Sequence, residues 1–147
     1  MAVTIEGRSR QAAVAVDLIM QHTHMVAELD RLTSSFASMA PTTDSFPRWI
    51  AVANWIRDVL IPHTEHEEQT CYRAASRLRS GRLLIDTLLT EHRLMRRLVG
   101  RFNESLDPVQ AAAYGRALFE VFTSHQHQEN EFLLPMLVDA GSMPPPE

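Results

Sequence analysis

The fold of this chain is decided most clearly by residues 118–136, which read LFEVFTSHQHQENEFLLPM. Apolar side chains recur there at steps of three and four, which is the period of one face of an α-helix. His125 and Glu129 fall on that same face. The stretch therefore predicts a helix over about 108–138 whose buried face carries polar residues. The expected inner face consists of Leu118, Val121, Phe122, His125, Glu129, Phe132 and Met136.

Three further segments have the helical period, and turn-forming residues separate them. These helices are expected over about 10–33, 47–80 and 83–103. The first break, 37–47, is polar and contains proline, and Pro62 is expected to kink the second helix. No segment predicts a strand. Four amphipathic helices with short connections predict an all-α, antiparallel up-down-up-down four-helix bundle.

The length of 147 residues and the 45% apolar composition suit a single domain, residues 1–147. Its core is expected over about 12–139, with a frayed proline-rich tail at 144–146. The single cysteine, Cys71, gives no sign of an oxidising compartment. The apolar run 12–16 is too short for a signal peptide or a membrane span. We therefore expect a cytoplasmic protein without a membrane partner.

The charged residues exclude several function classes. The net charge is −4, and the basic residues form no nucleic-acid footprint, so no nucleic-acid partner is expected. All 14 basic residues are arginine, which leaves no lysine for Schiff-base chemistry or for a P-loop. The chain also lacks the GxGxxG and GxSxG motifs of nucleotide-binding folds and α/β-hydrolases.

Four histidines occupy positions that the helical period reserves for core side chains: His22, His63, His92 and His125. His63 is followed by Glu67, and His125 by Glu129, at a spacing of i to i+4 that places each pair on one helix face. An internal repeat supports this pattern, because the HxxxE motif that begins at His63 returns at His125. The surroundings of His22 return in the same way around His92.

A metal site explains these positions better than a satisfied polar core does. One buried histidine is more often a hydrogen-bonded core residue than a ligand. A buried glutamate, however, is costly unless it is paired or metal-bound, and no lysine or arginine lies on the same face. Six side chains are therefore expected to converge on the bundle axis as a dinuclear site. They are His22, His63, Glu67, His92, His125 and Glu129.

The order His, HxxxE, His, HxxxE over four helices resembles the hemerythrin-like (HHE cation-binding) domain family, over about residues 12–139. The strings TEHRLM at 90–95 and 125–136 carry this resemblance most clearly. It implies a non-haem di-iron centre with an oxo or hydroxo bridge. The four histidines would be terminal ligands, and Glu67 and Glu129 would bridge the two iron ions. Zinc and manganese suit the same donors and stay open.

The chain departs from the oxygen carriers of that family at two positions. The carriers have a second histidine one turn after the third-helix histidine, where this chain has Arg96. They also have a carboxylate five residues after the fourth-helix histidine, where this chain has Asn130. These changes argue against reversible oxygen carriage. They leave open positions on the metal, or recruit His66 or Glu68 as a further ligand.

Helical phase sorts the remaining polar residues near the motifs. His24 and His127 each lie two residues after a core histidine, so they are expected to point away from the bundle axis. Cys71 is expected to pack in the core. Around the axis, apolar side chains should limit solvent access to the metal. They are Met25, Met95, Phe122 and Phe132.

The expected function is that of a di-iron protein that binds, senses or reacts with a small oxidant ligand, namely dioxygen, a peroxide or nitric oxide. Two alternatives stay open. One is a catalase-like, peroxide-scavenging enzyme, which peroxide turnover by the iron-loaded protein would reveal. The other is an iron-responsive interaction module whose protein partner is unknown, which an iron-dependent pull-down would reveal.

Overall fold

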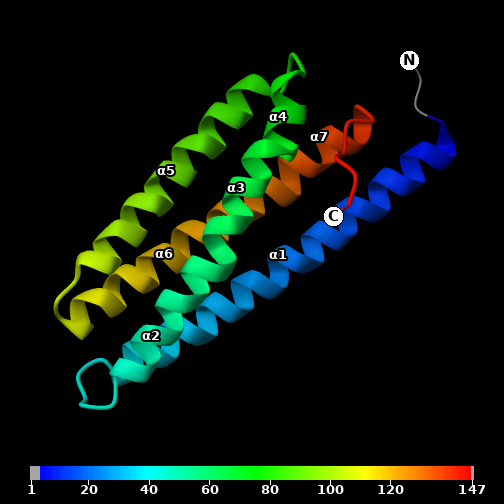
Figure 1. The fold of residues 1–147 in the computed structure, drawn as a ribbon. Coiled ribbons are helices and arrows are strands. Elements are labelled where there is room, and N and C mark those ends of the chain that lie inside the picture. The colour runs from blue at the N-terminus through cyan, green and yellow to red at the C-terminus, as the bar shows by residue number, and fades with distance from the viewer. Residues whose placement is uncertain (1–3, 147) are drawn as a thin grey trace.

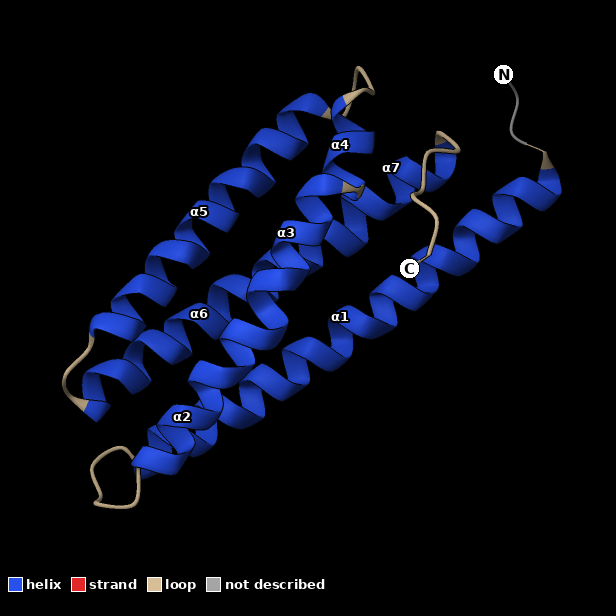
Figure 2. Ribbon diagram, viewed as in Figure 1, coloured by secondary structure: helices blue, strands red, loops and turns tan. Residues whose placement is uncertain are grey.

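The computed structural model describes residues 4–146, and every regular element in that range is a helix (Figure 2). The helices form four rods, and consecutive rods run in alternating directions (Figure 1). The all-α four-helix bundle is confirmed, and its course is compatible with the up-down-up-down order. The rods are α1 (Ile5–Met39); α2 (Phe46–Trp55), η1 (Ile56–Leu60), α3 (Ile61–Gln69) and α4 (Cys71–Ser76); α5 (Arg82–Glu104); and α6 (Pro108–Gln128), η2 (Glu129–Leu133) and α7 (Leu134–Asp139).

The first helix is longer than the sequence predicted. It runs to Met39, so the first break covers 40–45 instead of 37–47. The reason is the burial of Phe36, which continues the apolar face set by Leu29 beyond the polar pair at 34–35. The second rod ends at Ser76 instead of near 80, after a break at Thr70, whose φ of −117° and ψ of −85° leave the helical region.

Two π-helical segments, η1 and η2, each lead into a short α-helix that has a proline in its first turn. The prolines are Pro62 and Pro135. A proline in an uninterrupted helix would lack a donor and clash with the preceding turn. A change from π to α geometry lets each proline take a first-turn position, where its missing N–H leaves no broken bond.

The π-segments also rotate the buried face of the helix. Leu60 and Leu133 are fully buried, whereas Val59 is 36% exposed and Phe132 is 57% exposed. The sequence placed Phe132 on the inner face and assigned it to the lining of the site. That prediction is wrong, because the wider turn of η2 moves Leu133 inward in its place.

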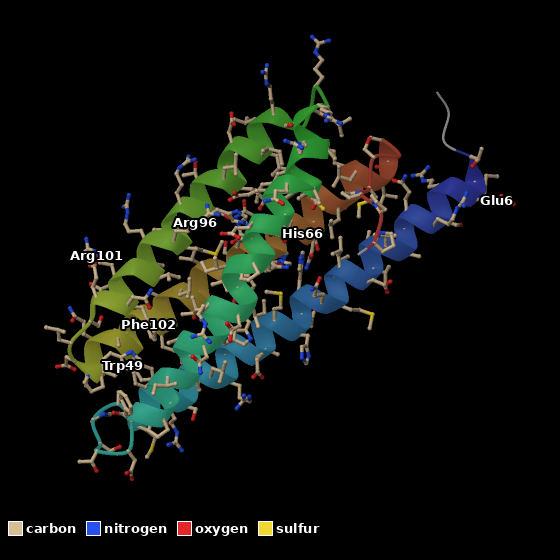
Figure 3. All side chains as sticks on the ribbon, in the orientation of Figure 1. Glu6, Trp49, His66, Arg96, Arg101 and Phe102 are labelled. Atoms are coloured by element: carbon tan, nitrogen blue, oxygen red, sulfur yellow. The ribbon has the colours of Figure 1, made fainter. Side chains whose placement is uncertain are left out.

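The core consists of two hydrophobic clusters. The first includes Leu29, Phe36, Phe102 and Phe122, and Trp49 packs against it (Figure 3). The second includes Leu88, Leu133 and Leu137. Along every rod the core histidines and glutamates lie between a residue of the first cluster and a residue of the second. The bundle therefore encloses its polar residues in a layer between two apolar layers.

The chain after α7 turns back along α1 (Figure 1). Gly141 has a φ of 65°, a left-handed conformation that glycine adopts without strain, and the Met143 amide donates a hydrogen bond to Gln11 Oε1 over 2.9 Å. Met143 is buried. The proline-rich segment 144–146, which the sequence predicted to fray, thus follows directly after the anchored residue Met143. Within residues 4–146, no helix has the length and apolar character needed to cross a membrane.

Candidate metal centre

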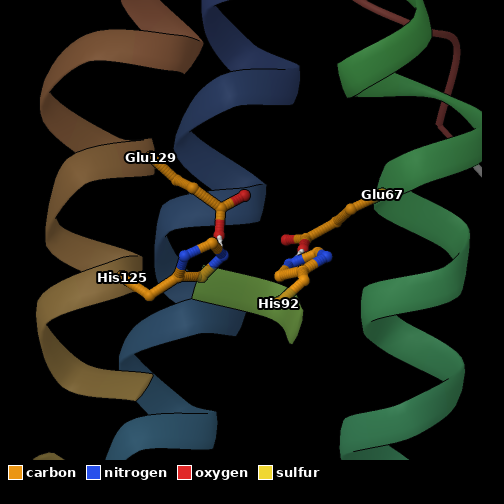
Figure 4. Close-up of side chains that lie close together, drawn as sticks. All are labelled: Glu67, His92, His125 and Glu129. Atoms are coloured by element: carbon orange, nitrogen blue, oxygen red, sulfur yellow. Dashed lines mark ion pairs between the residues drawn. The ribbon is translucent and has the colours of Figure 1, made fainter. Parts of the chain in front are cut away.

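All six residues selected from the sequence meet in the polar layer. Five of them are buried, and the side chain of His63 is 8% exposed. Each rod contributes at least one of these side chains, and Figure 4 shows four of them pointing toward a common centre. The convergence follows from the i to i+4 spacing, because His63 and Glu67 project from adjacent turns of α3 toward the same space.

The ligand-type atoms form two groups that share Glu67. In the first group, Glu67 Oε1 lies 3.2 Å from His22 Nε2 and 2.7 Å from His63 Nε2. In the second group, Glu129 Oε1 lies 2.8 Å from His125 Nε2, and Glu67 Oε2 lies 3.5 Å from His92 Nε2. The donor atoms within each group lie within 4.8 Å of one another. Glu67 therefore offers one oxygen to each group.

Three of the four histidines form a hydrogen bond through Nδ1, on the ring edge that faces away from the centre. Asn130 Oδ1 lies 2.8 Å from His22 Nδ1, Glu68 Oε1 lies 2.8 Å from His92 Nδ1, and Glu91 Oε2 lies 2.6 Å from His125 Nδ1. Each oxygen accepts a hydrogen bond from an Nδ1–H group. Nε2 then faces the centre and is the ring nitrogen that would bind a metal.

Tyr72 is a part of the site that sequence reasoning missed. Its hydroxyl lies 3.1 Å from His92 Nε2 and 3.0 Å from His125 Nε2, and the residue is only 2% exposed. Burial, together with the negative charge of Glu129, raises the pKa of Tyr72, so the phenol is protonated without a metal. Its place on an apolar helix face looked like that of any core aromatic residue, so the sequence carried no signal for it.

Unpaired polar atoms show that a cation fits this space. The buried side-chain atoms without a hydrogen-bond partner in residues 4–146 include His22 Nε2, His63 Nε2 and both carboxylate oxygens of Glu67. They lie close together, but the contacts among them lack hydrogen-bond geometry. Buried acceptors left in this way are costly unless something binds them. Imidazole and carboxylate donors suit iron, zinc and manganese ions.

A family model for the hemerythrin HHE cation-binding domain matches residues 13–137. The chain belongs to this family. None of the curated proteins and none of the solved structures compared with it gives a match. Family membership and the buried His/Glu cluster together support metal binding by this HHE domain.

Arg96, which stands where oxygen carriers have a histidine, does not reach the centre of this HHE domain. Its guanidinium donates a hydrogen bond to Glu68 Oε1 over 2.8 Å, and the same oxygen accepts from His92 Nδ1. Glu68 thus lies behind His92, on the ring edge that faces away from the metal groups, and neither metal group includes it. Arg96 and Glu68 support a histidine from outside the centre.

The prediction from helical phase that His24 and His127 lie outside the two metal-binding groups of this HHE domain is correct. His24 and His127 are exposed, which confirms that they point away from the axis. His66 is also exposed and belongs to neither group. Cys71 packs in the second cluster, and burial, with the charge of Glu67, raises the pKa of its thiol to about 12. This thiol is therefore protonated and unreactive at neutral pH.

Proposed function

We propose that this HHE domain holds two iron ions and uses them to bind, sense or react with a small oxidant, namely dioxygen, a peroxide or nitric oxide. One ion would be held by His22 and His63, the other by His92, His125 and Glu129, with Glu67 shared between them. A second bridge by Glu129 is part of the proposal. The observation that carries it is the convergence of three Nε2 atoms, from His22, His63 and His92, on the unpaired carboxylate of Glu67, beside the contact of His125 Nε2 with Glu129.

When bound, an iron pair supplies Lewis acidity and electrons to a small ligand. The protein supplies everything else. Asn130, Glu68 and Glu91 accept hydrogen bonds from Nδ1–H of three imidazole rings and orient them so that Nε2 is the nitrogen that would bind a metal. The Tyr72 hydroxyl lies where it can donate a hydrogen bond into the centre or, as a phenolate, would bind a ferric ion. The apolar layers cover the centre at both ends along the bundle axis, and the low polarity there strengthens these interactions.

Peroxide consumption is a second candidate, and one observation favours it. A pocket of about 620 Å³ reaches His22, His63 and Glu67 from the outside, between α1 and α3. Exogenous molecules therefore have a route to one side of the centre. Reversible oxygen carriage needs the opposite, a tightly enclosed ligand position.

The test is metal loading of the purified chain with ferrous iron without oxygen. We expect two iron ions per chain in the native protein and fewer than two in His63→Ala and Glu129→Ala. His24→Ala and His127→Ala are the matched controls and are expected to keep both ions, because these rings are exposed. A fully folded chain that takes up no iron would contradict the proposal.

A spectrum of the loaded protein separates the possible ligand chemistries. We expect near-ultraviolet absorption from an oxo-bridged ferric pair, a change in that spectrum on addition of azide, and oxidation of the reduced protein in air without a long-lived oxygen adduct. An oxygen complex that survives repeated deoxygenation cycles would instead indicate a carrier. Zinc or manganese as the ion that copurifies would redirect the proposal to another metal.

A further inference from the structure

The pocket between α1 and α3 has a third wall, which the C-terminal tail provides. After the anchored residue Met143, the three prolines at 144–146 line the pocket opposite the helices. The volume of about 620 Å³ thus depends on a segment that is fixed at one end by burial and by the hydrogen bond to Gln11.

The pocket has a polar floor and apolar walls. Its floor is the metal centre itself, through His22, His63, Glu67 and Glu129. The walls are mostly hydrocarbon. They consist of Val14, Leu18, Met25, Val59, Leu134 and the three prolines. A few precisely placed polar groups at the end of an apolar pocket are typical of small-molecule sites.

The size of the pocket exceeds what a diatomic ligand or hydrogen peroxide needs. Such molecules are little larger than water, which occupies about 30 Å³ in the liquid. Sites for organic molecules measure roughly 300–1,000 Å³. The pocket falls within this range, so its walls have room for a hydrocarbon group in addition to the atoms that would meet the metal.

The charges around the pocket favour an uncharged molecule. Asp17 and Asp58 lie at the exposed end, Glu67 and Glu129 lie at the floor, and none of the described lining residues is an arginine. In the metal-free chain an anionic ligand would therefore meet carboxylates at both ends, and the groups in the lining that can carry a positive charge are histidines. The metal-free pocket therefore favours an uncharged molecule over a fatty acid or a phosphate ester.

We propose that the pocket binds an uncharged organic hydroperoxide, with its hydrocarbon part against the apolar walls and its peroxy group toward His22, His63 and Glu67. The identity of the reacting group rests on the proposed di-iron function. Binding of the hydrocarbon part depends on the pocket alone and is measurable without a metal.

The reaction is reduction of the hydroperoxide to an alcohol and water. The O–O bond breaks, the oxygen attached to carbon leaves as the alcohol, and the other oxygen leaves as water. Two protons come from solvent. Two electrons come from a pair of ferrous ions, which become ferric, so a single turnover needs no other reductant.

Binding is tested first, on the metal-free full chain, with 2-phenyl-2-propanol as an unreactive probe. This uncharged alcohol is the reduction product of cumene hydroperoxide. Calorimetry and saturation-transfer NMR are expected to show one saturable site. Val59→Trp places a large ring at the exposed end of the pocket and is expected to weaken binding by about tenfold or more. Val109→Trp, an exposed valine at the start of α6 that does not line the pocket, is the matched control.

Removal of residues 144–147 provides a second variant, which takes away the proline wall and is expected to weaken binding of the alcohol as well. In the iron-loaded, reduced protein, Val59→Trp is expected to slow the oxidation of iron by cumene hydroperoxide much more than its oxidation by hydrogen peroxide. The absence of saturable alcohol binding, or equal binding by Val59→Trp, overturns the pocket assignment. A chain that binds the alcohol but takes up no iron overturns the reduction step and the function on which it rests.

Discussion

The Oε2 atom of Glu91 lies 2.6 Å from the Nδ1 atom of His125, and this contact joins α5 to α6 directly behind the metal centre. The other oxygen of Glu91 accepts a hydrogen bond from the Gln128 side chain over 2.6 Å. The hydrogen bond from His125 holds the pKa of Glu91 below its usual range, so the carboxylate is ionised at neutral pH. Glu91 thus fixes both the orientation and the tautomer of the ring.

Glu91→Ala is predicted to lower the affinity for the metal by roughly 10–100-fold, because the His125 ring loses the partner that holds Nδ1–H and keeps Nε2 directed toward the centre. The measurement is a competition titration against a chelator of known affinity. Glu104→Ala, an exposed glutamate at the end of the same helix, is the matched control and should bind as the native protein does. Equal affinities in the two variants would show that Glu91 does not tune the site.

Arg96→Ala is predicted to weaken metal binding less, by no more than about tenfold. Arg96 acts only through Glu68, and its side chain is 40% exposed, so water screens the pair. Arg97→Ala is the control on the next, exposed position of α5. The same titration measures both variants. A larger effect at Arg97 than at Arg96 would contradict the hydrogen-bonded chain from His92 through Glu68 to Arg96.

Tyr72→Phe is predicted to remove a visible absorption band from the ferric protein. Its hydroxyl lies near the Nε2 atoms of His92 and His125, and those lone pairs are no longer available to accept its proton once they bind a metal. We predict that a ferric ion bound by these histidines takes the Tyr72 oxygen as a further ligand and that the phenol proton passes to solvent, which gives ferric phenolate absorption. Tyr114→Phe is the control. A band that persists in Tyr72→Phe with two iron ions bound would exclude this role.

The rotation of the inner face by η2 is tested by two phenylalanines. Phe122 is fully buried in the first cluster, whereas Phe132 is exposed. Phe122→Ala is predicted to lower the free energy of unfolding by about 3–5 kcal/mol. Phe132→Ala is predicted to change it by less than about 1 kcal/mol. Chemical denaturation of the metal-free protein measures both values. A large decrease in the free energy of unfolding of Phe132→Ala would instead support the regular helical register that the sequence indicated.

The sequence predicted the bundle and the convergence of the six side chains because both depend on one regular quantity, the period of the helix. His22 and His92 stand out only because they occupy positions that the period assigns to apolar residues. Each helix keeps its own phase over many turns. Each histidine is therefore assigned to the buried face of its own helix without any knowledge of the loops.

The features that the sequence did not reveal depend on contacts between helices or on a local change of period. Glu91 and Glu68 lie beside their motifs in sequence, but each supports a histidine on a different rod. Tyr72 reaches the centre because the break at Thr70 ends α3 and starts α4, so its side chain does not follow the phase set by His63 and Glu67. Phe132 was misplaced because a π-turn adds a residue that the period of 3.6 does not contain.

Metal affinity is predicted to fall as the pH falls from about 8 to about 6, and His125 supplies the reason. Burial alone lowers the pKa of this histidine, but the contacts with Glu129 and Glu91 outweigh burial and raise the pKa to about 10. The ring of the metal-free protein is therefore doubly protonated at neutral pH. Its Nδ1 donates a hydrogen bond to Glu91, and its Nε2 lies 2.8 Å from Glu129 Oε1 as an ion pair.

A metal ion that binds Nε2 must displace that proton, so binding releases it to solvent. Because the pKa is raised, the proton is present throughout the range below about pH 10, and each unit of pH decrease costs up to about tenfold in affinity per proton released. Glu129 works in the same direction, since burial and the charge of Glu67 raise its pKa as well. Calorimetric titration of the metal in buffers with different ionisation enthalpies counts the released protons. An affinity independent of pH, with no proton release, would mean that His125 is already neutral in the metal-free protein and that its contacts with the two glutamates do not hold the second proton.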